Sequence, residues 1–125
     1  MAHILLVDDD PLLRKVLQAT LEAQGYQIVA VDDGKAALNV FSPQKFDIVI
    51  TDLVMPEMDG LEFILRLRKD YAAVPILALS GGGRSRNMEV LEHAGAFGAT
   101  AVLPKPFLPE QLVQLVATLL KTKPE

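Results

Sequence analysis

Apolar and polar positions along the chain follow two periods, which alternate from one end to the other. Five short apolar runs are typical of β-strands, and after each of them apolar residues recur every three or four positions, as in an amphipathic helix. The runs expected as strands are 3–7, 27–31, 47–51, 76–79 and 101–103. Helices are expected from 11 to a stop at Gly25, and over 35–41, 61–71, 85–94 and 109–120.

This alternation predicts an α/β fold in which a parallel sheet is covered by helices on both faces. Because crossovers between parallel strands are right-handed, few topologies remain. For five strands we expect the flavodoxin-like order 2-1-3-4-5, with a switch point between the first and third strands. The length of 125 residues fits a single domain, which we expect over residues 1–125.

Composition narrows the function classes. Half of the residues are hydrophobic, yet no apolar run reaches the roughly 18 residues that a membrane span needs. No signal peptide is evident, and the chain has no cysteine, which excludes disulfides and thiolate metal sites within it. The net charge is -4, from 12 basic and 16 acidic residues, without a Lys/Arg cluster. We therefore expect a cytoplasmic protein with neither nucleic acid nor membrane among its partners.

Carboxylates follow two of the expected strands. One apolar run leads to Asp52, and the first strand ends in Asp8, Asp9 and Asp10. Asp10 has a sufficient structural role, because it precedes Pro11 and suits the N-cap of a helix. In the expected strand order, Asp8, Asp9 and Asp52 meet at one edge of the sheet, where open α/β sheets bind ligands.

Three carboxylates at such short range would repel one another and raise each other's pKa values. A Mg²⁺ ion, which prefers oxygen ligands, would relieve this repulsion. The fourth strand brings the hydroxyl of Ser80 to the same edge, and the fifth ends near Lys105. A nucleophilic carboxylate, a metal, a hydroxyl and an ammonium group suit phosphoryl transfer. Taken singly, Asp52 also fits a turn cap and Lys105 an ordinary surface lysine.

Taken together, these residues resemble the motifs of the receiver domains of two-component response regulators, and the resemblance covers the whole chain. The motifs that carry it are Val7-Asp8-Asp9, Thr51-Asp52-Leu53-Val54-Met55-Pro56, Asp59-Gly60, Ser80 and Lys105-Pro106.

The resemblance implies a role for each motif. Asp52 would accept a phosphoryl group from a phosphohistidine on a sensor histidine kinase or a histidine phosphotransfer protein. Asp9, Asp52 and the backbone carbonyl of Val54 would ligate Mg²⁺, with Asp8 supporting the ion through water.

Ser80 and Lys105 would contact the phosphoryl oxygens, and the peptide bond between Lys105 and Pro106 would be cis. One position departs from the family pattern. Val102 stands where receiver domains usually carry the Tyr or Phe of their conformational switch. Valine is too short and too stiff for that movement.

Three functions remain open. The first is a signalling switch that is phosphorylated on Asp52, changes its affinity for a downstream protein, and has no turnover as an enzyme beyond gaining and losing its own phosphoryl group. The second is a small Mg²⁺-dependent phosphatase or phosphotransferase, against which the lack of a long substrate-binding insertion counts. The third is a binding module with a redundant acidic pocket. No output domain is expected within the 125 residues, so we expect a stand-alone regulator or a piece of a longer chain.

The last expected helix has a wide apolar face, which leaves two interpretations open. It packs on the sheet, or part of it forms a surface for a partner or a dimer. Its apolar residues are Leu112, Val113, Leu115, Val116, Leu119 and Leu120.

Overall fold

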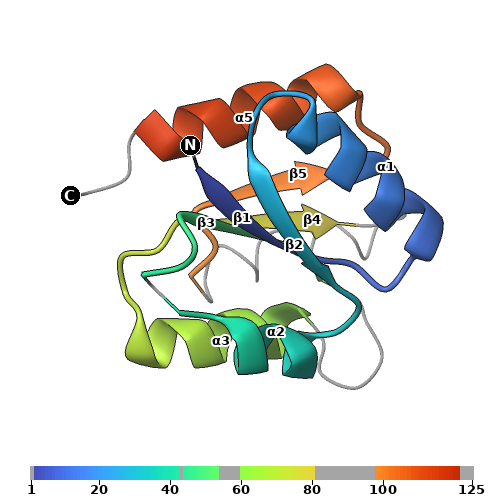
Figure 1. Cartoon of the computed structure of the whole chain (residues 1–125). Helices are drawn as coiled ribbons and strands as arrows, with labels where there is room; N and C mark the ends of the chain where they lie inside the picture. The colour runs from blue at the N-terminus through green and yellow to red at the C-terminus, as the bar shows by residue number, and fades with distance from the viewer. Residues whose placement is uncertain (1, 43, 54–59, 81–97, 122–125) are drawn as a thin grey trace.

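A computed structural model describes residues 2–42, 44–53, 60–80 and 98–121 as a five-stranded parallel sheet between two layers of helices. The strand order is β2-β1-β3-β4-β5, which confirms the predicted flavodoxin-like topology. Helices α1 and α5 cover one face of the sheet, and α2 and α3 cover the other (Figure 1). The strands are β1 (His3–Val7), β2 (Gln27–Val31), β3 (Ile48–Asp52), β4 (Ile76–Ser80) and β5 (Ala101–Pro104). The helices are α1 (Pro11–Glu22), α2 (Gly34–Val40), α3 (Gly60–Asp70) and α5 (Pro109–Lys121).

The predicted element bounds agree with the structure to within about two residues at most ends, which is the usual uncertainty of helix ends. Strands β3, β4 and β5 each run one residue further than predicted, so that β3 includes Asp52 and β4 includes Ser80, and α1 ends at Glu22, before the predicted stop at Gly25. The predicted helix over 85–94 lies outside the described residues. Among the described residues, no helix combines the length and apolar content required to cross a membrane.

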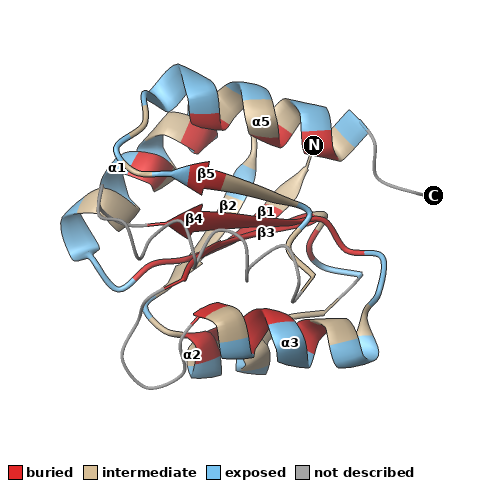
Figure 2. Ribbon diagram, turned by 180° about the vertical axis from the view of Figure 1, so that it is seen from behind, coloured by how far each residue is buried: buried red, intermediate tan, exposed pale blue. Residues whose placement is uncertain are grey.

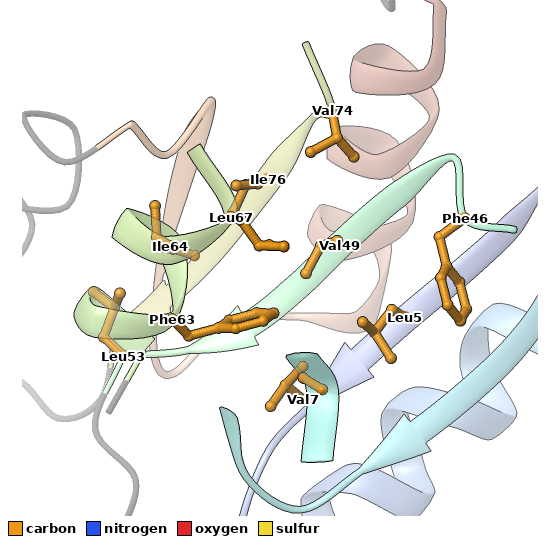
Figure 3. Close-up of a cluster of buried hydrophobic side chains, with 12 residues drawn as sticks. Leu5, Val7, Phe46, Val49, Leu53, Phe63, Ile64, Leu67, Val74 and Ile76 are labelled. Carbon is orange, nitrogen blue, oxygen red and sulfur yellow. The ribbon is translucent and has the colours of Figure 1, made fainter. Parts of the chain in front are cut away.

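Strict alternation of side chains along the central strands produces two apolar cores. Leu5, Val49 and Ile76 face α2 and α3, where they pack with Phe63 and Leu67 (Figure 3). Their sequence neighbours point to the opposite face and pack against α1 and α5; the members from the strands are Ile4, Leu6, Ile48, Ile50, Leu77, Leu79 and Leu103. Every residue of β3 and β4 is buried (Figure 2). Such strands read as continuous apolar runs because helices cover both of their faces.

Most of the apolar face of α5 packs against the sheet. Leu112, Val116 and Leu119 are buried, and Leu115 and Leu120 pack partly against the same cluster. Packing on the sheet, the first of the two interpretations, accounts for these five residues.

Arg68 on α3 binds the segment that precedes β5 through hydrogen bonds. Its guanidinium donates hydrogen bonds to the carbonyl oxygens of Gly98 at 2.8 Å and of Val74 at 2.6 Å. It also donates to the hydroxyl of Thr100 at 3.2 Å, and this hydroxyl accepts a second bond from the amide of Ile76 at 3.0 Å. These bonds hold the start of β5 beside the start of β4, so they help to set where β5 ends.

Candidate functional site

The carboxyl ends of the strands bring the predicted site residues to one edge of the sheet. Asp52 is the last residue of β3 and Ser80 the last of β4, while Asp8 follows β1 directly. The exposed fractions of Asp8, Asp52 and Ser80 are 0%, 6% and 2%, so these polar side chains are buried. Asp9 is exposed, at the mouth of the same edge.

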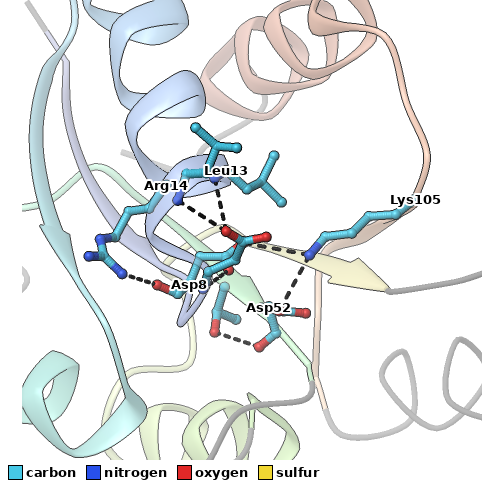
Figure 4. Close-up of polar contacts among 8 residues, drawn as sticks. Asp8, Leu13, Arg14, Asp52 and Lys105 are labelled. Atoms are coloured by element: carbon cyan, nitrogen blue, oxygen red, sulfur yellow. Dashed lines mark hydrogen bonds and ion pairs between the residues drawn. The ribbon is translucent and has the colours of Figure 1, made fainter.

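Lys105 lies between two of the carboxylates. Its Nζ is 3.3 Å from Oδ2 of Asp52 and 3.6 Å from Oδ2 of Asp8 (Figure 4). The backbone of Lys105 is held as well, because its amide donates to the carbonyl of Ser80 at 2.6 Å. The peptide bond between Lys105 and Pro106 is cis, as predicted. An ammonium group bridging two buried carboxylates partly neutralises them, and such a cation is suited to an incoming anionic group.

The three aspartates have the spacing of a metal site. Asp8, Asp9 and Asp52 each offer a carboxylate oxygen, and these oxygens all lie within 4.8 Å of one another. Oδ2 of Asp8 is buried and accepts no hydrogen bond from the described residues, although the ammonium of Lys105 lies 3.6 Å away. A buried carboxylate oxygen without a hydrogen bond is costly, and one ammonium shared with Asp52 offsets that cost only in part. The donor set therefore fits a hard divalent ion such as Mg²⁺. Val54, the predicted backbone ligand, lies outside the described residues.

The pKa of Asp8 is raised, as predicted, but repulsion between carboxylates is not the main cause. The pKa of Asp8 is raised chiefly because the carboxyl group is buried, and the negative charge of Asp9 adds only a smaller part. The amide of Asp10 and the ammonium of Lys105 act in the opposite direction and lower this pKa. Burial outweighs repulsion because Asp9 is exposed and its charge is screened by water.

Two further residues position the site, and the sequence did not predict the contact that either of them makes. Gly60 packs against the backbone of Asp52, and Arg14 donates from Nη1 to the carbonyl oxygen of Asp8 at 2.7 Å. The sequence indicated Gly60 as a loop residue and as part of the Asp59-Gly60 motif, without a role for it in the site, and it indicated no role for Arg14. One feature of the sequence could have indicated the contact of Arg14. This residue lies one turn after the N-cap Asp10, so its long side chain can reach back to Asp8.

Comparison with protein families and known proteins agrees with this architecture. Residues 4–117 match the model of the response regulator receiver domain. The transcriptional regulatory protein GlrR of Escherichia coli K12 is 36% identical over 115 residues, which cover 92% of this chain and 25% of GlrR. The response regulator MprA of Mycobacterium avium is 39% identical over 124 residues, which cover 98% of this chain and 53% of MprA. The chain thus spans between a quarter and about half of the length of these relatives.

Solved structures give the same result at the level of the whole fold. The chemotaxis response regulator CheY4 of Vibrio cholerae superimposes with a TM-score of 0.83 at 37% identity, covering 95% of this chain and 98% of CheY4. The receiver domain of a signal transduction histidine kinase from Syntrophus aciditrophicus gives a TM-score of 0.87 at 29% identity, covering 100% of this chain and 96% of the other. With the family match over nearly its whole length, the chain belongs to the response regulator receiver domain family.

Proposed function

We propose that this chain is a phosphorylation-dependent switch of a two-component signalling system. Asp52 accepts a phosphoryl group from a histidine of a sensor kinase or a histidine phosphotransfer protein. The phosphorylated form then changes its affinity for a downstream protein. The observation that carries this proposal is the carboxylate of Asp52, at the end of a fully buried strand, 3.3 Å from the ammonium of Lys105 and within ligand distance of Asp8 and Asp9.

The proposed reaction is an in-line transfer between two side chains. A carboxylate oxygen of Asp52 forms a bond to phosphorus while the bond between phosphorus and the histidine ring nitrogen breaks, and the ring nitrogen keeps the electron pair. Lys105 and Ser80 stabilise the phosphoryl oxygens with an ammonium and a hydroxyl donor.

Asp8, Asp9 and Asp52, with the backbone carbonyl of Val54, are the proposed ligands of Mg²⁺. When bound, the ion supplies positive charge that neutralises the phosphoryl oxygens and the carboxylates together. The ammonium of Lys105, 3.3 Å from Oδ2 of Asp52 and 3.6 Å from Oδ2 of Asp8, holds both carboxylates in place by charge.

We propose that residues 1–125 form one phospho-acceptor domain of the cytoplasm and that it is not an enzyme with turnover on small molecules. Its own chemistry is limited to gaining and losing the phosphoryl group of Asp52. GlrR and MprA are about four and two times longer than the aligned region, which supports a response carried by a further domain. CheY4 is covered to 98% of its length, which supports a response carried by a separate downstream protein.

Stoichiometry separates this function from its alternatives. With Mg²⁺ and acetyl phosphate as a small phosphoryl donor, the chain should gain one phosphoryl group per molecule and release no phosphate from p-nitrophenyl phosphate. Continuous turnover of that ester would indicate a phosphatase. A chain that binds Mg²⁺ but never gains a phosphoryl group, from acetyl phosphate or from a phosphohistidine protein, would indicate a binding module instead.

A further inference from the structure

Arg14 of α1 makes a contact that the proposed chemistry does not yet use. Its guanidinium reaches back over the start of the helix, and Nη1 donates a 2.7 Å hydrogen bond to the backbone carbonyl of Asp8 (Figure 4). The side chain is half-buried. A charged donor at this distance forms a stronger hydrogen bond than a neutral one.

The reason for this contact lies in how the sheet ends. In the parallel pairing of β1 with β2, the amide of Asp8 donates to the carbonyl of Val31 at 3.2 Å. The next bond of such a ladder would run from the amide of Asp33 to the carbonyl of Asp8. However, Asp33 has left the strand to become the N-cap of α2, where its Oδ1 accepts from the amide of Ala36 at 2.7 Å. Arg14 supplies the donor that the strand no longer provides.

With this bond, Asp8 is fixed at three points. Its amide is bound to Val31, its carbonyl to Arg14, and its Oδ1 accepts from the amide of Asp10 at 2.9 Å. The remaining oxygen, Oδ2, faces Lys105. The plane of the peptide between Asp8 and Asp9 is set by the same carbonyl, so it governs where both carboxylates lie.

We infer that Arg14 is a positioning residue for a divalent cation at the cluster of Asp8, Asp9 and Asp52. It holds the peptide that joins the first two aspartates so that their oxygens remain at ligand distance from Asp52. This role rests on the proposed function, because it requires that the cluster binds Mg²⁺.

The sign of the effect distinguishes positioning from charge. Arg14 is a cation close to a cation site, so the loss of its charge alone would tighten Mg²⁺ binding. Loss of a positioning contact does the opposite. Removal of outer-shell partners of metal ligands typically weakens metal affinity by about 10- to 100-fold.

The test is calorimetric titration of the metal-free chain with Mg²⁺, without any phosphoryl donor. Arg14→Met should weaken the affinity by about tenfold. Arg14→Lys keeps the charge but has a shorter side chain with one nitrogen, so its Mg²⁺ affinity should lie between those of the wild type and Arg14→Met. The matched control is Lys15→Met, which removes the same charge from the next, exposed residue and should leave the affinity unchanged or slightly tighter.

Phosphorylation by acetyl phosphate provides a second readout. In Arg14→Met, the Mg²⁺ concentration that gives half-maximal phosphorylation should rise, while the yield at saturating Mg²⁺ should equal that of the wild type. Unchanged or tighter Mg²⁺ binding by both Arg14 variants overturns the positioning role, as does an equal loss in Lys15→Met. If wild type binds Mg²⁺ but gains no phosphoryl group at any concentration, the proposed function fails, while the calorimetric comparison still decides the role of Arg14.

Discussion

Gly60 packs directly against the backbone of Asp52. A Cβ atom added at Gly60 would overlap the carbonyl oxygen of Asp52 and lie 2.6 Å from the Cα of Leu53. The amide of Gly60 also donates to the carbonyl of Leu53 at 2.9 Å. The first residue of α3 thus contacts the proposed acceptor without any intervening side chain, and only glycine leaves room for this.

Gly60→Ala is expected to destabilise the fold and to impair phosphorylation of Asp52. The new methyl group must displace backbone rather than a flexible side chain, which costs about 1–3 kcal/mol of unfolding free energy. Denaturant unfolding and the rate of phosphorylation by acetyl phosphate would measure the two effects. Gly25→Ala is the control: its Cβ meets nothing within 4 Å, but its φ of +96° is unfavourable for alanine. It should lose stability without slowing phosphorylation, and an equal loss of rate in both variants would contradict the contact argument.

Asp8→Asn should stabilise the metal-free chain at neutral pH relative to wild type. Burial raises the folded-state pKa of Asp8, so the folded state binds a proton more tightly than the unfolded state. The stability from this proton is fully present below about pH 4, the ordinary range of an aspartate, and is lost as the pH rises through the folded-state pKa. Asparagine keeps the acceptor for the amide of Asp10 and carries no charge.

The measurement is the difference in unfolding free energy between wild type and Asp8→Asn as a function of pH. The difference should grow in favour of the variant as the pH rises through the folded-state pKa of Asp8. Saturating Mg²⁺ should reverse the order, because an ion at 100 times its Kd stabilises the wild type by about 2.7 kcal/mol. A variant that is less stable than wild type in metal-free buffer at neutral pH would refute the burial argument.

Leu12 is expected to take part in docking the phosphohistidine donor. It is 73% exposed at the start of α1, next to Leu13, which lines an apolar hollow with Pro106 and Phe107 beside Lys105. Leu12→Ser should slow transfer from a phosphohistidine protein by at least several-fold and leave phosphorylation by acetyl phosphate intact. The matched control is Leu65→Ser on α3, another exposed leucine, which should change neither rate. Equal losses with both donors would rule out a docking role for Leu12.

Because Val102 replaces the usual Tyr or Phe, we expect the conformational switch of this chain to work without movement of the side chain at position 102. It is half-buried on β5, pairs with Ala78 of β4, and packs against the core on the side of α2 and α3. Because its branched side chain has few rotamers, we expect little movement there. With beryllofluoride and Mg²⁺ as a phosphoryl mimic, amide NMR shifts should change most at residues 53–60 and 80–90 and little at Val102. Val102→Tyr should respond more strongly over β5 and α5, whereas a native chain that already responds most there would contradict the expectation.

The fold was predictable because its signals are periodic and local. The apolar runs of β3 and β4 are buried on both faces, so their composition alone indicates central strands. Asp10 was predicted as an N-cap, and it does accept from the amides of Leu12 and Leu13. The strand order followed from the right-handedness of crossovers together with the common flavodoxin-like order of five-stranded sheets, rather than from any single residue.

The sequence predicted only those features of the site that follow from the positions of residues at the ends of the strands. Asp8, Asp52 and Lys105 lie where the sheet order places them, and their proximity follows from it. The contacts of Gly60 and Arg14 were not predictable, because each depends on the exact path of a turn: the return of the chain to Asp52 and the departure of Asp33 from β2. The larger contribution of burial to the pKa of Asp8 likewise needs the depth of the side chain.

The central claim is that Asp52 is the phosphoryl acceptor, and mass spectrometry of the intact chain tests it most directly. After incubation with acetyl phosphate and Mg²⁺, wild type should gain the mass of one phosphoryl group, and hydroxylamine, which cleaves acyl phosphates, should remove it. The nearly isosteric Asp52→Asn variant should fold as wild type does and gain no phosphoryl group. A hydroxylamine-sensitive phosphoryl group that appears on Asp52→Asn at the wild-type rate would contradict the account.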